Sequence, residues 1–397
     1  MTSPPPPPRP AIPRTVWALG FVSLFMDISS EMIHALLPLF LTVGLGASVV
    51  LVGVIEGVAE ATASIAKVFS GYLSDRIGRR KPLIFVGYAL GALSKPFFAL
   101  AAAPLTVFVA RFADRIGKGL RGAPRDALVA DVTPESIRGR AYGVRQALDT
   151  AGAFIGPLLA IVLMAAFAND MRTVFWFAVI PAGLAVLLVL YGVEDRAAAP
   201  EEKRSRPPVR LADMRQLGGA FWGVVAVGVA FTLARFSEAF LVLKAHDEGL
   251  PLALAPLVLV AMNVVYSLGA FPAGAWSDRA SPETVLLWGL AALVLADLAL
   301  ALAPGVTGAF VGITLWGVHM ALSQGLLAKL VAQSASTELR GSAFGLFNLA
   351  TGVTMLFASA IAGLLWVYVG STATFLGGAA FAVLAAFLVI RLHPKAH

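Results

Sequence analysis

Twelve long apolar segments follow one another along the 397-residue chain and constrain its fold more than any other feature. A membrane-spanning helix needs about 20 consecutive apolar residues. Since 397 divided by 12 is about 33, each segment has room for one such helix and a short connection. The segments span residues 16–43, 49–72, 82–102, 105–129, 140–165, 172–193, 217–243, 252–275, 283–302, 307–331, 341–368 and 372–392.

The apolar runs are continuous and do not alternate with polar residues, which favours helices over a β-barrel. Only 13% of the residues are charged, against about 25% in soluble domains, and 58% are hydrophobic. This composition excludes an ordinary soluble enzyme. We therefore predict an all-α polytopic membrane protein with 12 transmembrane helices.

The longest polar stretch, 194–216, divides the chain into two halves. We predict a disordered N-terminal stub over 1–15, a six-helix bundle over 16–193 and a cytoplasmic linker over 194–216. A second six-helix bundle should cover 217–392, and a short tail 393–397.

Positive charges are concentrated in alternate connections, as expected where basic residues mark the cytoplasmic side. One side collects the linker cluster and Arg76, Arg79, Arg80, Lys81, Arg138, Arg140, Arg279 and Arg340, whereas the other holds only Arg172 and Lys244. Both termini should then be cytoplasmic, in the inner membrane of a bacterium. The enrichment of basic residues in cytoplasmic connections accounts for the net charge of +7. We therefore expect the lipid bilayer as a partner and not nucleic acid.

The two halves carry related motifs at a nearly constant offset. The segment from Gly71 to Arg76 recurs 203 residues later as Gly274 to Arg279, and Arg138 to Gly143 recurs 202 residues later as Arg340 to Gly345. Such repeats in the same orientation are typical of transporters whose binding site lies between the halves.

With these motifs the sequence resembles the major facilitator superfamily over its whole length. The resemblance rests on the loop with Gly71, Asp75, Arg76, Gly78 and Arg79, and on its weaker copy with Asp278 and Arg279. It implies two parallel six-helix repeats, a monomer, and a cytoplasmic latch formed by the Asp and Arg side chains. It also implies that spans 1, 4, 7 and 10 line a central cavity.

Ionisable residues within spans are costly and usually mark transport pathways or proton relays. In the first half they lie on shared helix faces, and we expect the acids of spans 1 and 2 to pair with the bases of span 4. The candidates for proton coupling are Asp27, Glu31, His34, Glu56, Glu60, Arg111, Asp114, Arg115, Lys118, Arg145 and Asp149. Asp27 and Glu31 are the strongest candidates for proton carriers.

The second half is poorer in charge. Its candidate cavity residues are Arg235, Glu238, Asn263, Tyr266, His319 and Gln324. Asp27, Glu31 and His34 could also ligate a divalent cation, with His319 as a fourth ligand, although we expect no metal. The chain lacks a phosphate-binding loop and the hydrolase motifs. We therefore expect no enzymatic activity and no cofactor, with the proton gradient as energy source.

Gly152, Gly156 and Pro157 in span 5 are similar to the Gly-x-x-x-Gly-Pro motif of proton-coupled drug exporters, although Leu158 and Leu159 replace the glycine pair that follows it there. We therefore expect a secondary transporter that exports a small solute by proton antiport. The alternatives are a proton-coupled importer of an organic anion or nutrient, a divalent-metal transporter, and a membrane receptor that does not transport.

Overall fold

The computed structural model describes residues 11–195, 214, 216–277, 279–323, 325–336 and 339–392. This part of the chain is helical and contains no strand. The helices of the first half are α1 (Arg14–His34), α2 (Leu37–Leu39), α3 (Val49–Ile77), α4 (Lys81–Leu100), α5 (Pro104–Val132), α6 (Arg138–Ala166) and α7 (Met171–Gly192). Those of the second half are α9 (Gly219–Ala234), α10 (Ala239–Asp247), α11 (Leu257–Ser277), α12 (Pro282–Leu302), α13 (Gly305–Ser323), α14 (Leu326–Ser334), α15 (Arg340–Tyr368) and α16 (Ser371–Leu392). The π-helical turn η1 (Phe40–Gly44) and the 3₁₀ turns η2 (Glu135–Ile137) and η4 (Leu252–Leu254) complete the set.

Eleven helical stretches in the described residues are long and apolar enough to cross a membrane. The predicted fourth span corresponds to α5, which matches the others in length at 29 residues but carries many charges. Its apolar face is therefore narrower than that of its neighbours, and it depends on other helices to neutralise its charged face.

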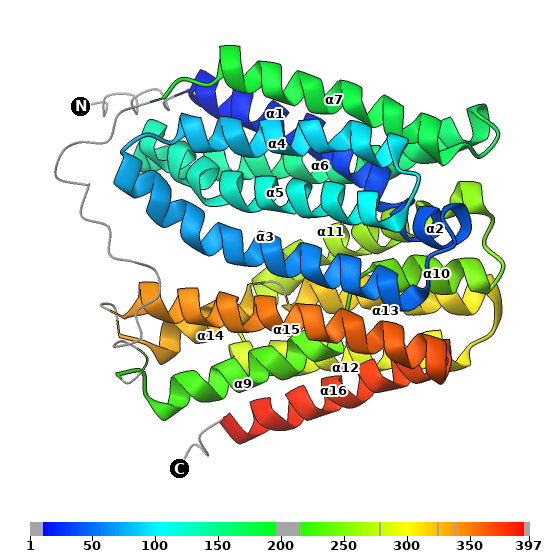
Figure 1. The fold of residues 1–397 in the computed structure, drawn as a ribbon. Coiled ribbons are helices and arrows are strands. Elements are labelled where there is room, and N and C mark those ends of the chain that lie inside the picture. Colours follow the sequence, from blue (N-terminus) through cyan, green and yellow to red (C-terminus); the bar gives the residue numbers. More distant parts are fainter. Residues whose placement is uncertain are drawn as a thin grey trace, which may run out of the picture.

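Helices α1–α7 occupy the upper part of Figure 1 and α9–α16 the lower part. The start of α1 and the end of α16 lie at the same end of the molecule (Figure 1). The predicted domain bounds and the cytoplasmic side of the termini stay predictions. Residues 1–10, 196–213 and 393–397 lie outside the described residues.

Three predicted spans are interrupted, which corrects the sequence-based expectation of continuous helices. Span 1 ends as a regular helix at His34, shortly before Pro38, which has no N–H for the helical ladder. Span 7 breaks between Ala234 and Ala239, where Ser237 Oγ accepts a hydrogen bond from the Ala239 N–H. Span 10 breaks next to Gly325, whose φ of +75° suits glycine.

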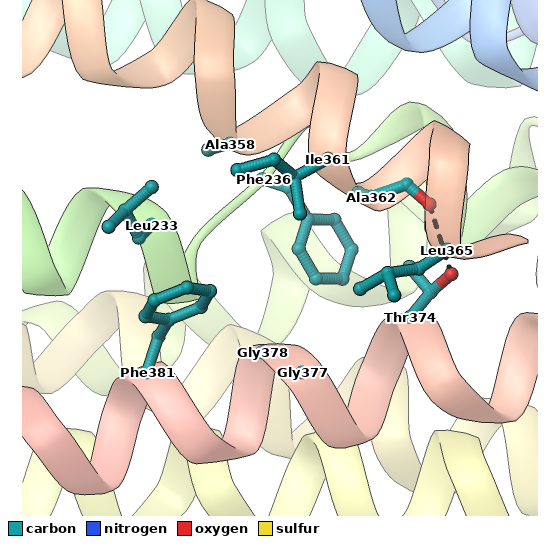
Figure 2. A pocket seen from close by; sticks show the side chains of 10 residues that line it. All are labelled: Leu233, Phe236, Ala358, Ile361, Ala362, Leu365, Thr374, Gly377, Gly378 and Phe381. Atoms are coloured by element: carbon teal, nitrogen blue, oxygen red, sulfur yellow. Dashed lines mark hydrogen bonds between the residues drawn. The ribbon is translucent and has the colours of Figure 1, made fainter.

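A small apolar cavity lies beside the break in span 7 (Figure 2). Its walls come from α9, α15 and α16, and from Phe236 within the break. Discontinuous helices in transporters commonly hold substrates or coupling ions.

The two halves approach each other most closely along α3 and α15. A Cβ atom on Gly57 would lie 2.9 Å from the Leu356 carbonyl oxygen, and one on Gly363 would lie 2.9 Å from Val50 Cα. These contacts involve the first third of α3, which begins at the end of the molecule opposite the start of α1 (Figure 1). The halves are therefore sealed together at that end.

We predict that Gly57→Leu opens this seal, because overpacking a tight contact costs about 1–3 kcal/mol. The chain has no cysteine, so a single Ser359→Cys can report on the interface without background labelling. Ser359 is fully buried, and we expect its cysteine to react with a maleimide faster when Gly57→Leu is also present. Gly143→Leu is the matched control, since a Cβ there meets no atom within 4 Å. Equal labelling in both backgrounds would contradict the prediction.

Candidate functional site

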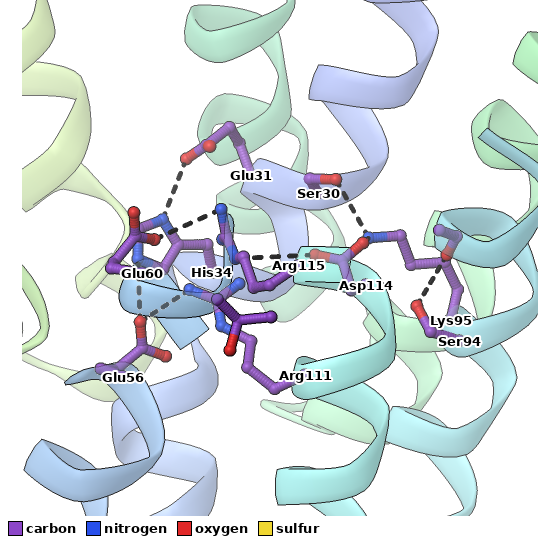
Figure 3. A network of polar contacts seen from close by, with 12 residues as sticks. Ser30, Glu31, His34, Glu56, Glu60, Ser94, Lys95, Arg111, Asp114 and Arg115 are labelled. Atoms are coloured by element: carbon purple, nitrogen blue, oxygen red, sulfur yellow. Dashed lines mark hydrogen bonds and ion pairs between the residues drawn. The ribbon is translucent and has the colours of Figure 1, made fainter. Parts of the chain in front are cut away.

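The centre of the first half contains a buried ion pair between α3 and α5 (Figure 3). Arg111 Nη2 donates to Glu56 Oε2 at 2.7 Å, and both side chains are almost completely buried. His34, the last residue of α1, lies between two carboxylates. Its Nδ1 is 3.4 Å from Glu31 Oε2, and its Nε2 is 3.9 Å from Glu56 Oε2. The imidazole thus joins α1 to the α3–α5 pair.

A second branch continues the network towards α4. Arg115 Nη1 lies 3.3 Å from Glu60 Oε1, and Arg115 Nε lies 3.8 Å from Asp114 Oδ2. Asp114 Oδ1 in turn accepts a hydrogen bond from Lys95 Nζ at 2.9 Å. Lys95 also donates to Ser30 on α1 at 3.0 Å. Lys95 was not among the predicted site residues, although a buried lysine within an apolar segment is a signal that the sequence offers.

A third group of charges lies between α1 and α6. The carboxyl groups of Asp27 and Asp149 lie within hydrogen-bonding reach of each other. Asp149 is also 3.5 Å from Arg125 Nη1 and 3.7 Å from Arg145 Nη1. Arg125, like Lys95, was not among the predicted site residues.

The expected pairing of Asp27 with a base of span 4 is therefore wrong. Helix α6 lies next to this part of α1 because Gly152 and Gly156 have no side chain. A Cβ on Gly152 would lie 3.0 Å from Asp27 Cβ, and one on Gly156 would lie 2.8 Å from the Ile28 carbonyl oxygen. The glycines of the predicted packing motif thus bring the two acids together, and Pro157 is buried within the same helix.

Lys118 was also expected to pair with an acid. It is exposed, and none of the ion pairs in the described residues includes it. It nevertheless lies within electrostatic range of Asp27, Glu31, Glu60 and Asp149. Its ammonium group is therefore accessible and not held by any one of these acids in an ion pair.

In the second half, the break in span 7 faces this network. Arg235 and Glu238 lie in the break with their charged groups 3.9 Å apart, and Glu238 is within electrostatic range of His34, Glu31 and Glu60. The structure thereby places Glu238 of the second half within electrostatic range of the predicted residues of the first half.

The remaining predicted residues of this half are placed differently. Asn263 and Tyr266 are half-buried on α11. His319 is fully buried, with Nδ1 2.9 Å from the Gly289 carbonyl oxygen, so it packs between α12 and α13 and does not line a cavity. Gln324 lies outside the described residues.

The loop motif also differs from its predicted pairing. Asp75 pairs with Arg80, which lies 3.3 Å from Asp131 as well, whereas Arg76 and Arg79 are exposed. Gly78 ends α3 with a φ of +72°, and Gly71 packs against Ala123. The ion pairs of this loop therefore centre on Arg80. In the second copy Arg279 is exposed, and Asp278 is outside the described residues.

The described residues contain no group of three or more His, Cys, Asp or Glu side chains that could hold a metal ion. Asp27, Glu31 and His34 share a helix face, but Asp27 turns to Asp149 and Glu31 to His34. His319 is buried elsewhere. The geometry therefore gives the metal-transport alternative no support.

We predict that Glu56→Gln and Arg111→Gln each destabilise the protein strongly. Removing one partner of a buried ion pair leaves the other charge uncompensated, at a cost of about 3–5 kcal/mol. The double variant should be more stable than either single variant. Thermal unfolding of the purified protein in detergent measures all three. Additive losses in the double variant would show that the pair does not act as a unit.

The comparisons with known proteins agree with this architecture. The model of the Major Facilitator Superfamily matches residues 19–262 and 239–397. An uncharacterised MFS-type transporter of Methanocaldococcus jannaschii is 29% identical over 383 residues, covering 95% of this chain and 94% of the relative. The multidrug resistance protein MdtH of Edwardsiella ictaluri is 27% identical, covering 88% and 83%.

Among solved structures, the nucleoside transporter NupG superposes with a TM-score of 0.83 at 12% identity, covering 96% of this chain and all of NupG. At that identity the likeness concerns the fold alone. The family match covers nearly the whole chain, and the eleven apolar helices and the charged helix α5 fit its architecture. This chain is thus a multi-pass membrane protein that belongs to the Major Facilitator Superfamily.

Proposed function

We propose that this protein exports a small organic solute across the cytoplasmic membrane of a bacterium in exchange for protons, by alternating access. Membership of a transporter family supports transport as the activity. The relative named as a multidrug resistance protein supports export. The proposal includes the proton gradient as energy source and a monomer that needs no cofactor.

The observation that carries the proposal is the pair of carboxyl groups on α1 and α6. Two carboxyl groups can hydrogen-bond to each other only when one of them holds a proton, because an ionised carboxylate only accepts. Loss of that proton from Asp27 or Asp149 places two negative charges side by side. Proton release therefore changes the force between α1 and α6 directly.

This pair is connected to the rest of the site. Arg125 and Arg145 hold Asp149 from α5 and α6, and Lys118 lies close to both acids. His34, at the end of the same helix α1, lies within electrostatic range of Glu238 in the second half. A change of protonation in the first half can therefore alter contacts between the halves, which is what ion-coupled alternating access requires.

A second candidate function is proton-coupled import of an organic anion. The exposed, unpaired ammonium group of Lys118 favours it, because such a group can bind a carboxylate or phosphate of the solute. Export and import of an anion would use the same site and differ only in the direction of the driving gradient.

We predict that Asp27→Asn and Asp149→Asn uncouple transport from the proton gradient. Two coupled ligands, here the proton and the solute, typically change each other's affinity about 5–150-fold. In these variants the factor should fall to near one. Purified protein in proteoliposomes with an internal pH-sensitive dye, tested with ethidium and with fluorescein, measures the coupling. Glu135→Gln is the matched control, because that carboxylate is 87% exposed. Full pH-driven transport by both variants would overturn the proposal.

We predict that Lys118→Gln separates the two candidate functions. If the solute is anionic, binding of fluorescein should weaken about tenfold or more, since a hydrogen bond to a charged group contributes about 1.5–3 kcal/mol. Binding of ethidium should be unchanged or stronger. Lys67→Gln is a matched control, since Lys67 is exposed on α3 and packs over Gly122. A loss of ethidium binding alone would argue against anion recognition by Lys118.

A further inference from the structure

The carboxyl group of Asp297 on α12 is isolated in the interior of the second half. Asp297 is 0% exposed, and neither carboxyl oxygen has a hydrogen-bond partner. None of the ion pairs of the described residues includes it. An ionised carboxylate in such surroundings is strongly disfavoured, and the group neutralises instead by holding a proton.

The elements around Asp297 offer no counter-charge. The titratable side chains on the helices packed against α12 and on the nearby break are Tyr266 of α11, His319 of α13, Lys329 of α14, Arg391 of α16, and Arg235 and Glu238 of the break. His319 contacts the Gly289 carbonyl, Lys329 donates to the Ser277 carbonyl, and Arg391 lies over the Phe387 ring. Arg235 faces Glu238. No cation is therefore available to keep Asp297 ionised.

One free acceptor does lie near the carboxyl group. A Cβ atom on Gly378 would be 2.7 Å from Asp297 Oδ2 and 3.3 Å from the carbonyl oxygen of Ala234. The two oxygen atoms therefore border the same small space. Ala234 is the last residue of α9, so its carbonyl has no N–H of its own helix to accept from. A protonated Asp297 can turn a hydroxyl hydrogen towards this carbonyl, whereas an ionised Asp297 cannot.

The surroundings suit a proton better than a metal ion. Hard cations take several oxygen ligands. Here a Cβ atom on Gly378 would also lie 3.0 Å from Cε1 of the Phe236 ring. The space beside Asp297 is therefore bordered by an apolar ring and not by further oxygen ligands. The cavity in Figure 2 is lined by these same two residues, Phe236 and Gly378.

The break in span 7 connects this carboxyl group with the network of the first half. One side of the break presents the Ala234 carbonyl and Phe236 to Asp297. The other side carries Glu238, which lies within electrostatic range of His34. A rearrangement of the break would remove the acceptor from Asp297 and move Glu238 at the same time.

We propose that Asp297 is a second proton-binding residue of the transport cycle, which holds its proton while the end of α9 faces it and releases it when the break rearranges. The role in the cycle rests on the proposed proton-coupled transport, whereas the protonated state rests on the local geometry alone. The two can therefore be tested separately.

Infrared difference spectroscopy of the purified full-length protein, titrated from acid to alkaline buffer, tests the protonated state without any solute. We expect carbonyl-stretch absorption from protonated carboxylic acids that decreases as the pH rises. The component from Asp297 should be missing in Asp297→Asn, whereas a component from the Asp27–Asp149 pair should remain. Asp170→Asn is the matched control. Asp170 is an acid at the start of α7, and its hydrogen bond from Thr173 lowers the pKa of its carboxyl group, so its removal should leave the band unchanged. Identical spectra for the wild type and Asp297→Asn would overturn the proposal.

Transport in proteoliposomes then tests the role in the cycle, with ethidium and fluorescein as probes. We expect Asp297→Asn to retain exchange of the transported probe but to move fewer protons per molecule of it than the wild type. A band that stays constant at every pH, together with unchanged proton coupling in Asp297→Asn, would identify a permanently neutral structural residue and refute the proposal.

Gly378→Ala provides a second variant if Asp297→Asn does not fold. Its methyl group would press on Asp297 Oδ2 while leaving the acid in place, and should shift the midpoint of the infrared titration. An unshifted midpoint would count against the proposed position of the proton. If transport of neither probe depends on the pH gradient even in the wild type, the proposed function fails, and the infrared result still stands by itself.

Discussion

Charged side chains in a medium that water does not reach must be paired or neutral, and this requirement organises the structure. Helix α5 is the clearest case. Its bases cannot face lipid, so α3 supplies the acids Glu56 and Glu60 and α6 supplies Asp149. Lys95 of α4 pairs with Asp114, an acid of α5 itself. The packing of the first half follows from matching these charges as much as from filling space.

Glycines permit the close approaches that this matching needs. Gly152 and Gly156 let α6 reach the backbone of α1, and Gly57 lets α3 reach α15. Small residues are a common means of association where no hydrophobic effect drives helices together. In this protein Gly152 also lies directly against Asp27, where α6 packs on α1.

The breaks in spans 1 and 7 place polar groups at the centre. His34 ends α1, and Glu238 precedes α10, so both side chains come from points where the helix is interrupted. The second half is poor in charge, yet the same break in span 7 leaves a backbone carbonyl near Asp297. The break in span 7 thus serves both halves: Glu238 lies within electrostatic range of His34 in the first half, and the Ala234 carbonyl lies near Asp297 in the second half.

Much of the candidate site could be predicted from the charged residues within apolar segments. Asp27, Glu56, Arg111 and Arg115 stand out because isolated charges in such segments need a reason to be there. Their partners could not be predicted. Periodicity gives the face of a helix on which a residue lies, but not which neighbouring helix covers that face. Asp27 was therefore assigned to a base, and Arg80 was not named as the partner of Asp75.

The sequence by itself determined the class of the protein, the number of its long helices and the concentration of charge in the first half, because hydrophobic length and charge placement are local properties of the chain. The tertiary structure decided that Asp27 faces Asp149, that span 7 is broken, and that Asp297 has no partner. Such features depend on residues that are far apart in the sequence; Ala234 and Gly378, which border the space beside Asp297, are 144 positions apart. They depend on how whole helices pack, which no local pattern specifies.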